Sequence, residues 1–156
     1  MSFDTAVTLA TEGLIKPFEG CHRMLSADLC QAYPDPGTHA EPWTIWWGST
    51  HGVEKDAVWD RARGEDALTR EVLACAMNLL KQSPGLSQAT DARFAALISF
   101  VYNCGIGNYR ISTLKRRVNE GDWVEAAREI LKWNKAAGRV MPGLTRRRAA
   151  EAALLR

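Results

Sequence analysis

The chain has 156 residues, of which 46% are hydrophobic and 24% are charged, and its formal net charge is +2. This length predicts a single domain covering residues 1–156, and the weak positive charge argues against a dedicated nucleic-acid-binding protein. No run approaches the ~18 apolar residues that a membrane-spanning helix needs, so we expect no stable insertion into a membrane.

The first segment has the spacing of a helix. Apolar residues recur every three or four positions, at Phe3, Val7, Ala10, Leu14 and Phe18. Pro17 disfavours the helical conformation at Lys16, which predicts an end or a kink there, with Gly20 just beyond the helix. The start of the chain also lacks the basic and apolar regions of a signal peptide, which predicts synthesis in a cytoplasm.

Residues 31–52 carry turn formers and strand formers instead. Proline and glycine punctuate this region at Pro34, Pro36, Gly37, Pro42, Gly48 and Gly52. Between them, Trp43–Trp47 is rich in residues that favour strands. We therefore predict a small antiparallel sheet of short strands and turns.

From about residue 65 the pattern returns to helices. The expected helices carry the stripes Leu68–Leu79 and Phe94–Val101, start at Ser112-Thr113, run from Asp122 through Trp133, and finish with Leu144–Leu155. The expected breaks are Ser83-Pro84-Gly85, Gly105–Asn108 and Pro142-Gly143. Asp122 with Glu125 three positions later is typical of a capping box. One helix, a small sheet and then several helices predict an α+β fold with a cleft between the sheet lobe and the helical lobe.

Glu19 stands out as a candidate general acid. It follows Phe18 at the predicted end of the first helix, where the helix dipole and apolar neighbours both raise the pKa of a carboxyl group. A general acid near neutral pH needs such a raised pKa. Asp35 lies in a turn sequence and Thr44 on a predicted strand, where each is an ordinary residue when considered alone.

Several segments in a fixed order resemble the phage-type lysozymes of glycoside hydrolase family 24. They are Phe18-Glu19-Gly20, Ala32-Tyr33-Pro34-Asp35, Trp43-Thr44-Ile45, Gly48-Ser49-Thr50, Ala95–Gly105 and Gly143–Arg148 with Glu151. The resemblance covers residues ~10–155 and includes the T4-like endolysins.

The resemblance implies a lysozyme-like α+β fold and hydrolysis of the β-1,4 bond between N-acetylmuramic acid and N-acetylglucosamine in peptidoglycan. Carried over position by position, Glu19 is the acid, and Asp35 and Thr44 position the attacking water. An inverting outcome follows if the two carboxyl groups stand about 6.5–9.5 Å apart. The chemistry needs no metal and no organic cofactor.

The sequence departs from the family pattern in the segment between Glu19 and Asp35, which is longer than usual. It contains Cys21 and Cys30, two of four cysteines. Free thiols are the ordinary state in a cytoplasm, and a Cys21–Cys30 disulfide formed after release is the alternative. The cysteine and histidine spacings do not match a zinc motif.

Four further residues are predicted to bind substrate: Trp46, Tyr102, Asn103 and Arg146. Each has an ordinary alternative. Trp46 replaces a glycine of the family pattern, and strand alternation places one or two of Trp43, Trp46 and Trp47 in the core. Tyr102 and Asn103 are equally suited to capping and packing, and Arg146–Arg148 is expected to be a largely solvated helix start.

Two other functions remain open on the sequence. A lytic transglycosylase needs the acid but no water-positioning carboxylate, so Asp35 and Thr44 favour hydrolysis. A wall-binding module that has lost catalysis is the second alternative. We expect a monomer that binds peptidoglycan, acts in the periplasm or cell wall, and depends on a separate holin-like membrane permeabiliser.

Overall fold

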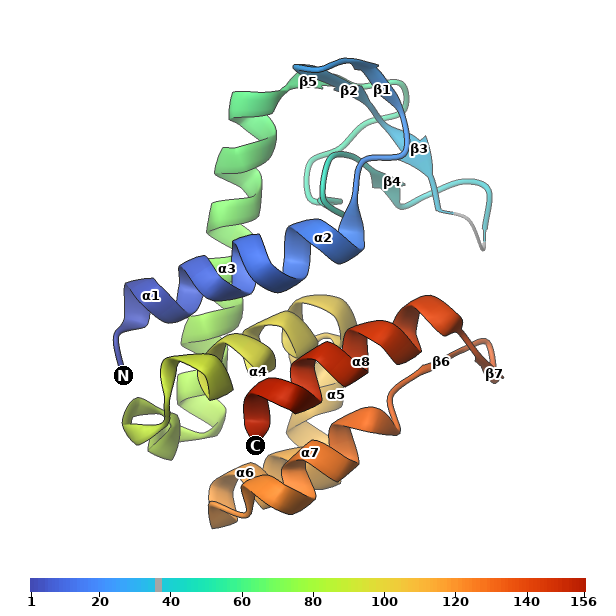
Figure 1. Ribbon diagram of the computed structural model, residues 1–156. Helices are drawn as coiled ribbons and strands as arrows, with labels where there is room; N and C mark the ends of the chain where they lie inside the picture. Colours follow the sequence, from blue (N-terminus) through green and yellow to red (C-terminus); the bar gives the residue numbers. More distant parts are fainter. Residues whose placement is uncertain (36–37) are drawn as a thin grey trace. The chain divides into compact units, whose positions relative to one another are not determined.

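The computed structural model describes residues 1–35 and 38–156, and its contacts group into two compact units. The helical unit comprises residues 1–18 and 72–156, and the sheet unit comprises residues 19–71. The chain passes from the first unit to the second at the end of the N-terminal helix and returns within α3 (Figure 1). Pro36 and Gly37, part of the predicted turn, lie outside the described residues. The expected α+β class is confirmed, whereas the cleft stays a prediction.

The N-terminal helix does not end at Lys16. It runs as α1 (Phe3–Thr8), a π-helical segment η1 (Leu9–Ile15) and α2 (Lys16–Glu19). The backbone N–H of Lys16 donates to the carbonyl five residues back, at Thr11. This wider turn relieves the clash that Pro17 would make with the carbonyl of Gly13, so the helix passes through the proline. Gly20 follows the helix with a φ of +55°, the left-handed conformation that glycine adopts without strain.

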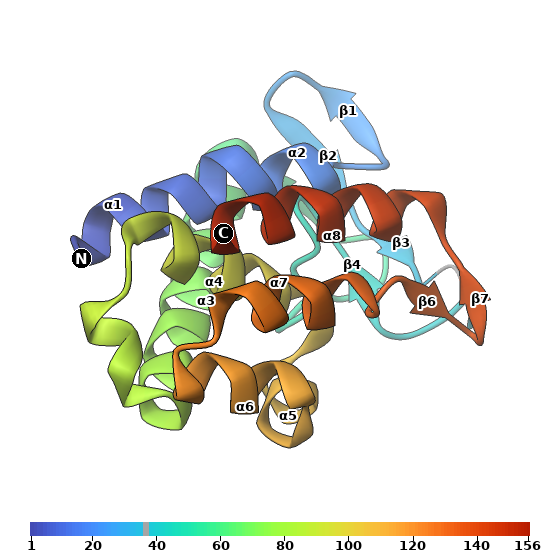
Figure 2. The same cartoon turned by 60° about the horizontal axis from the view of Figure 1, so that its bottom comes forward.

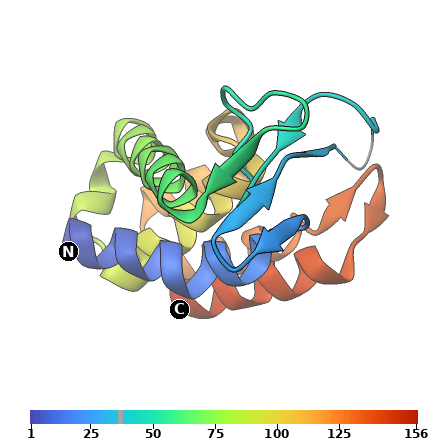
Figure 3. The same ribbon diagram turned by 90° about the horizontal axis from the view of Figure 1, so that it is seen from above.

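Two small antiparallel sheets make up the core of the sheet unit (Figure 3). The three-stranded sheet has the order β1-β2-β5, and its strands are β1 (Met24–Ser26), β2 (Leu29–Gln31) and β5 (Val58–Asp60). The two-stranded sheet pairs β3 (Tyr33–Pro34) with β4 (Trp43–Thr44). The strands expected within residues 31–52 are therefore present. The β1–β2 hairpin, which fills the segment that is long for the family, was not predicted.

The helical unit contains the following elements: α3 (Arg61–Gln82, shared with the sheet unit), the 3-10 helix η2 (Pro84–Gln88), α4 (Asp91–Cys104), α5 (Ile106–Ile111), α6 (Thr113–Glu120), α7 (Trp123–Leu131), β6 (Lys135–Ala136), β7 (Arg139–Val140) and α8 (Pro142–Leu155). Most of the predicted helices and breaks are found (Figure 2). Helix α4 ends before Gly105 as predicted, but the residues that follow form α5, which was not predicted. The expected break at Pro142-Gly143 was wrong, because both residues lie in the first turn of α8. Proline fits the first turn of a helix, because the backbone N–H that it lacks would have no partner within the helix there.

Helix α4 is the centre of the helical unit. Its residues from Phe94 to Val101 are all buried, and it packs against α1, η1 and α8. Side-chain oxygens cap three of the helices at their first turns: Thr90 accepts from the N–H of Arg93, Ser112 from Lys115, and Asp122 from Glu125. Each such cap satisfies a backbone donor that the helix itself leaves unpaired. Among the described residues, none of the helices combines the length and apolar character needed to cross a bilayer.

Trp46 anchors the core of the sheet unit. It is 2% exposed, and its indole N–H donates to the carbonyl of Trp59 at 3.2 Å. Trp47 is also buried, so the expectation that one or two of the three tryptophans enter the core is confirmed. The backbone of Trp46 has a φ of +50°, which explains why a glycine suits this position in the family pattern. Because so little of Trp46 is exposed, it cannot stack on a sugar, and its predicted role in substrate binding is wrong.

The indole of Trp46 lies directly against Gly64 of α3. A β-carbon built on Gly64 would come within 2.5 Å of Trp46 Cγ and Cδ1. We therefore expect Gly64→Ala to lower the free energy of unfolding by about 1–3 kcal/mol, because the ring must shift within a packed core. Gly107→Ala is the matched control, since a β-carbon there has no neighbour within 4 Å. Urea denaturation of both variants checks this, and equal stabilities would contradict it.

Candidate active site

Glu19 occupies the end of α2, at the point where the chain enters the sheet unit. The side chain is half-buried, while the neighbouring Phe18 is exposed. Phe18 therefore does not continue the apolar stripe of the first helix into the core. The left-handed turn at Gly20 ends the helix directly after the carboxylate, so Glu19 is held on regular secondary structure.

Tyr33 is related to both Glu19 and Thr44, to the first by charge and to the second by strand pairing. In the β3–β4 ladder Tyr33 lies directly opposite Thr44, and opposed residues of an antiparallel pair project from the same face of the sheet. Burial raises the pKa of Tyr33 to about 12, and the negative charge of Glu19 adds to that effect. Glu19 is therefore close enough to Tyr33 to act on it electrostatically. The ring of His22 also contacts Tyr33, edge-on, with 4.8 Å between the centroids.

Asp35 follows β3 directly and shapes the turn that leads to β4. Its carboxylate Oδ1 accepts from the N–H of Thr38 at 3.0 Å, and its own N–H donates to the carbonyl of Ala40 at 3.0 Å. The N–H of His39 in turn donates to the carbonyl of Asp35 at 2.8 Å. The sheet unit thus contains Glu19, Asp35 and Thr44, and it also contains Tyr33, which pairs with Thr44 and is affected by the charge of Glu19.

Glu41 is the other carboxylate near this turn. Its side chain is exposed, as expected, and it lines a cavity of about 480 Å³ with Pro42, Trp43, Thr50 and Val53. Among the described residues, no group of three or more His, Cys, Asp and Glu side chains is arranged to hold a metal ion.

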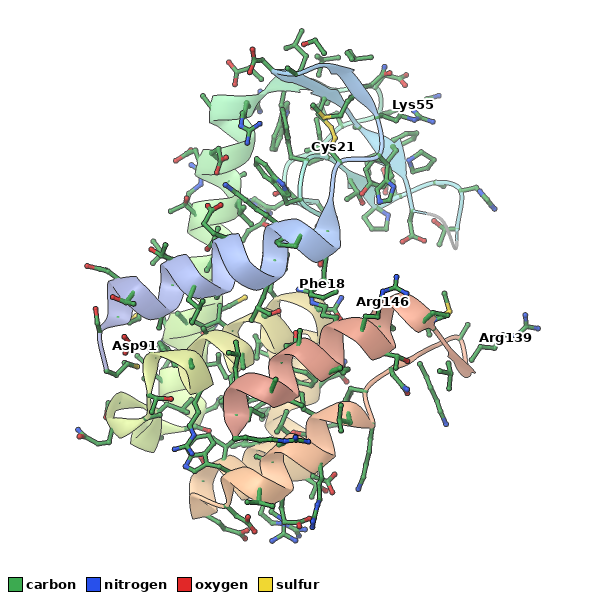
Figure 4. The ribbon with its side chains drawn as sticks, viewed as in Figure 1. Phe18, Cys21, Lys55, Asp91, Arg139 and Arg146 are labelled. Atoms are coloured by element: carbon green, nitrogen blue, oxygen red, sulfur yellow. A yellow bond between two sulfur atoms is a disulfide. The ribbon has the colours of Figure 1, made fainter. Side chains whose placement is uncertain are left out.

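A disulfide joins Cys21 to Cys30, whereas Cys75 and Cys104 remain thiols. The bridge links the turn after Glu19 to strand β2 and closes the β1 hairpin segment (Figure 4). The partner cysteine Cys30 is fully buried opposite Trp59. The bridge therefore ties the chain beside the candidate acid to the three-stranded sheet.

Reducing this disulfide should destabilise the protein. For nine residues of sequence separation, the loop-entropy relation gives a loss of about 2–3 kcal/mol in the free energy of unfolding. Urea denaturation of wild type and of Cys21→Ser/Cys30→Ser measures it. Cys75→Ser/Cys104→Ser serves as the control for losing two thiols, and an unchanged midpoint in the Cys21/Cys30 variant would refute the expectation.

Tyr33 makes the stability depend on alkaline pH. The unfolded phenol loses its proton near its ordinary pKa of 10, whereas the folded one loses it at about 12. The stability that this difference confers is complete below pH 10 and is lost as the pH rises through 12. Tyr33→Phe should therefore lose less stability than wild type between about pH 9 and about pH 11. Urea midpoints at the two pH values decide this, and parallel losses in both proteins would speak against it.

The remaining predicted substrate contacts lie in the helical unit. Tyr102 is half-buried on α4, Asn103 is exposed in the last turn of that helix, and Arg146 is exposed in the first turns of α8. The Asn103 amide oxygen accepts from Arg148 Nη2 at 3.0 Å, which is a structural role. Substrate binding by Tyr102, Asn103 and Arg146 stays a prediction.

Two of the three arginines at the start of α8 are buried, so the expectation of a solvated helix start was wrong for them. Arg147 is 3% exposed and Arg148 is 0% exposed, and both contact the fully buried Glu151 on the same helix. The Arg147 guanidinium also lies 5.9 Å from the ring centroid of Phe18. The sequence carries an indication of this, because residues three and four positions apart on a helix are neighbours and buried charged residues occur in pairs.

Glu151 holds this buried cluster together. Its Oε1 accepts from Ser99 Oγ at 2.7 Å and from Arg148 Nη2 at 3.0 Å, and its Oε2 lies 2.8 Å from Arg148 Nε as an ion pair without hydrogen-bond alignment. Burial raises the pKa of the Glu151 carboxyl, while the two guanidiniums and the Ser99 hydroxyl act in the opposite direction. Arg148 Nη1 also donates to the sulfur of Cys104 at 2.9 Å. The cluster joins α4 to α8.

The family model for phage lysozymes matches residues 16–151. The chain belongs to the phage lysozyme family. It is 36% identical to an endolysin of Bacillus phage PZA, over 95% of this chain and 54% of that protein. It is 34% identical to an endolysin of Acyrthosiphon pisum secondary endosymbiont phage 1, over 90% of this chain and 91% of the relative.

Among solved structures, the chain is similar to the muramidase domain of SpmX from Asticaccaulis excentricus, with a TM-score of 0.76 and 29% identity. That similarity covers 99% of this chain and 95% of the other. The chain spans about half the length of the Bacillus phage PZA endolysin. Family membership therefore assigns the fold and the class of protein, and the activity of this chain is argued below from its own residues.

Proposed function

We propose that this member of the phage lysozyme family is a peptidoglycan hydrolase that cleaves the β-1,4 bond between N-acetylmuramic acid and N-acetylglucosamine. Glu19 protonates the leaving oxygen, and Asp35 and Thr44 hold the attacking water. The observation that carries the proposal is the grouping of these residues within the sheet unit, where Glu19 acts on Tyr33 and Tyr33 pairs with Thr44. The names of the relatives, endolysin and muramidase, support the same class of reaction.

The hydrogen bonds of Asp35 bear on its role. Its Oδ1 accepts a hydrogen bond from the N–H of Thr38 at 3.0 Å, which orients the carboxylate. A carboxylate fixed in this way can accept a proton from water while Thr44, on the strand that pairs with β3, contributes a hydroxyl. The proposal includes inversion, because in an inverting hydrolase one carboxyl group acts as the acid and the other activates the attacking water.

We propose in addition that residues 1–156 act as one catalytic domain and as a monomer. On this proposal the substrate is bacterial peptidoglycan, the protein is made in the host cytoplasm, and it acts in the periplasm or cell wall after a separate holin-like protein has permeabilised the membrane. No nucleic acid takes part.

Clearing of permeabilised bacterial cells, followed as turbidity, tests the proposed activity. A hydrolase clears the suspension, whereas a wall-binding module sediments with the cells and leaves the turbidity unchanged. Asp35→Asn separates hydrolysis from transglycosylation, because only hydrolysis needs the activated water. We expect Asp35→Asn to slow clearing by on the order of 10²-fold or more. Full activity of that variant would favour a lytic transglycosylase.

A further inference from the structure

Charge is distributed very unevenly along this chain. The sheet unit contains five Lys and Arg residues against ten Asp and Glu, a net charge of −5. The helical unit contains fifteen Lys and Arg residues against eight Asp and Glu, a net charge of +7. The overall charge of +2 is therefore the sum of an acidic sheet unit and a strongly basic helical unit. A polyanion would be attracted to the second.

The basic excess arises within residues 106–148, which hold eleven Lys and Arg residues and four acids. Three of the acids pair with a cation on their own helix: Glu120 with Arg117, Glu125 with Arg128, and Glu129 with Lys132. The fourth, Asp122, caps α7 and lies 4.0 Å from Arg117. These acids thus neutralise Arg117, Arg128 and Lys132. The other exposed cations of residues 106–148 have no acidic partner within this segment.

A cavity of about 400 Å³ at the α5–α6 junction gathers three of these remaining cations. Arg110, Lys115 and Arg116 line it, together with Asn119 and the already paired Glu120. Arg110 and Arg116 take part in no ion pair with any residue that the structure describes. Lys115 Nζ donates to the neutral amide oxygen of Gln82 at 3.0 Å, which positions the ammonium without cancelling its charge.

The junction that carries these side chains is held firmly. Ser112 Oγ donates to the carbonyl of Tyr109 at 2.7 Å and accepts from the N–H of Lys115 at 3.0 Å. Tyr109 is fully buried, and its hydroxyl lies 2.8 Å from Ser83 Oγ. The α5–α6 junction that lines the cavity is therefore anchored to the core of the helical unit, which lowers the entropy cost of binding. Figure 2 shows α5 and α6 next to each other within this unit.

We propose that this basic cavity binds the phosphate ester groups of an anionic polymer of the bacterial envelope. Guanidinium groups bind phosphate oxygens in pairs of hydrogen bonds, and an ammonium adds a point charge. The cavity is of the size that holds a phosphate with its attached polyol or sugar. Binding here would retain the protein on its substrate independently of cleavage. The inference rests on the proposed function, because that function places the protein at the wall.

The test compares two charge-matched pairs of substitutions in the inactive Glu19→Gln background. Arg110→Gln/Arg116→Gln removes two uncompensated cations from the cavity. Arg128→Gln/Lys132→Gln removes two cations of the same unit that are paired on their own helix. Co-sedimentation measures binding to purified peptidoglycan that carries wall teichoic acid, to the same material stripped of it by hydrofluoric acid, and to phosphatidylethanolamine vesicles containing lipopolysaccharide.

We expect the Glu19→Gln protein to bind a phosphate-bearing surface at least about tenfold more tightly than stripped peptidoglycan, a preference that falls with added salt. The cavity pair should abolish that preference and the control pair should keep it. A preference for teichoic acid or for lipopolysaccharide identifies the source of the phosphate. Equal losses in both pairs, or equal binding of bare and phosphate-bearing surfaces, would overturn the proposal. Digestion of stripped peptidoglycan by the wild-type protein tests the proposed function separately.

Discussion

Glu19→Gln should lower the rate of peptidoglycan cleavage by about 10²–10⁴-fold, because glutamine has no proton of carboxylic acidity to give to the leaving oxygen. The substitution keeps the size and the hydrogen-bonding ability of the side chain. Glu19 is half-buried at the end of α2, and glutamine can occupy the same place on the helix. A loss of activity can therefore be assigned to chemistry when the unfolding transition of the variant is unchanged.

Glu41→Gln is the matched control for this prediction. Glu41 carries a carboxylate on the same sheet unit, but its side chain is exposed, whereas that of Glu19 is half-buried. Initial rates of turbidity loss with permeabilised cells compare the two variants. Glu41→Gln should retain activity close to that of wild type. Equal losses in the two variants, or retained activity in Glu19→Gln, would remove Glu19 from the role of acid.

Glu151→Gln should lower the free energy of unfolding by about 3–5 kcal/mol, because it removes the negative charge of the carboxylate that two buried guanidiniums contact. Arg147 and Arg148 are both almost inaccessible to water, and Glu151 accepts from each of them and from Ser99. Glutamine can still accept hydrogen bonds but carries no charge. The guanidiniums would have to remain buried without the negative charge of Glu151, or the start of α8 would have to open.

Three further variants, Glu12→Gln, Arg148→Met and the double variant Glu151→Gln/Arg148→Met, make this result specific. Glu12→Gln breaks the exposed Glu12–Lys16 pair of the same unit, which should cost about 1 kcal/mol or less. Combining Glu151→Gln with Arg148→Met also removes one of the two buried guanidiniums. The double variant should therefore lose less stability than the sum of the losses in Glu151→Gln and Arg148→Met. Urea denaturation provides all four values. A loss of under 1 kcal/mol in Glu151→Gln would show that the cluster contributes little to stability.

The sequence predicts some elements of this fold better than others, for physical reasons. Helices α3 and α4 carry long apolar stripes and end at glycine or proline, and both were found. The β1–β2 hairpin has almost no apolar alternation, since all of β1 is exposed, and its stability comes from the disulfide and from pairing with β5. The β6–β7 hairpin is exposed as well, and no local pattern predicts it.

Side-chain burial was predicted less well where it depends on tertiary partners. Strand alternation indicates that some of the three tryptophans enter the core but cannot select Trp46, whose burial depends on Gly64 of α3. Pro17 is compatible with a continuous helix only because the preceding turns are π-helical, which no propensity scale anticipates. Glu19, Asp35 and Thr44 were chosen from the order of their motifs, and their catalytic roles stay predictions.

The masses of the muropeptides released from purified peptidoglycan test the central claim most directly. Digestion by the wild-type protein should give reducing products that have gained one water molecule, and Glu19→Gln should release none of them. Anhydro products from wild type would contradict the hydrolytic role of Asp35 and Thr44. Undiminished release by Glu19→Gln would contradict the assignment of Glu19 as the acid.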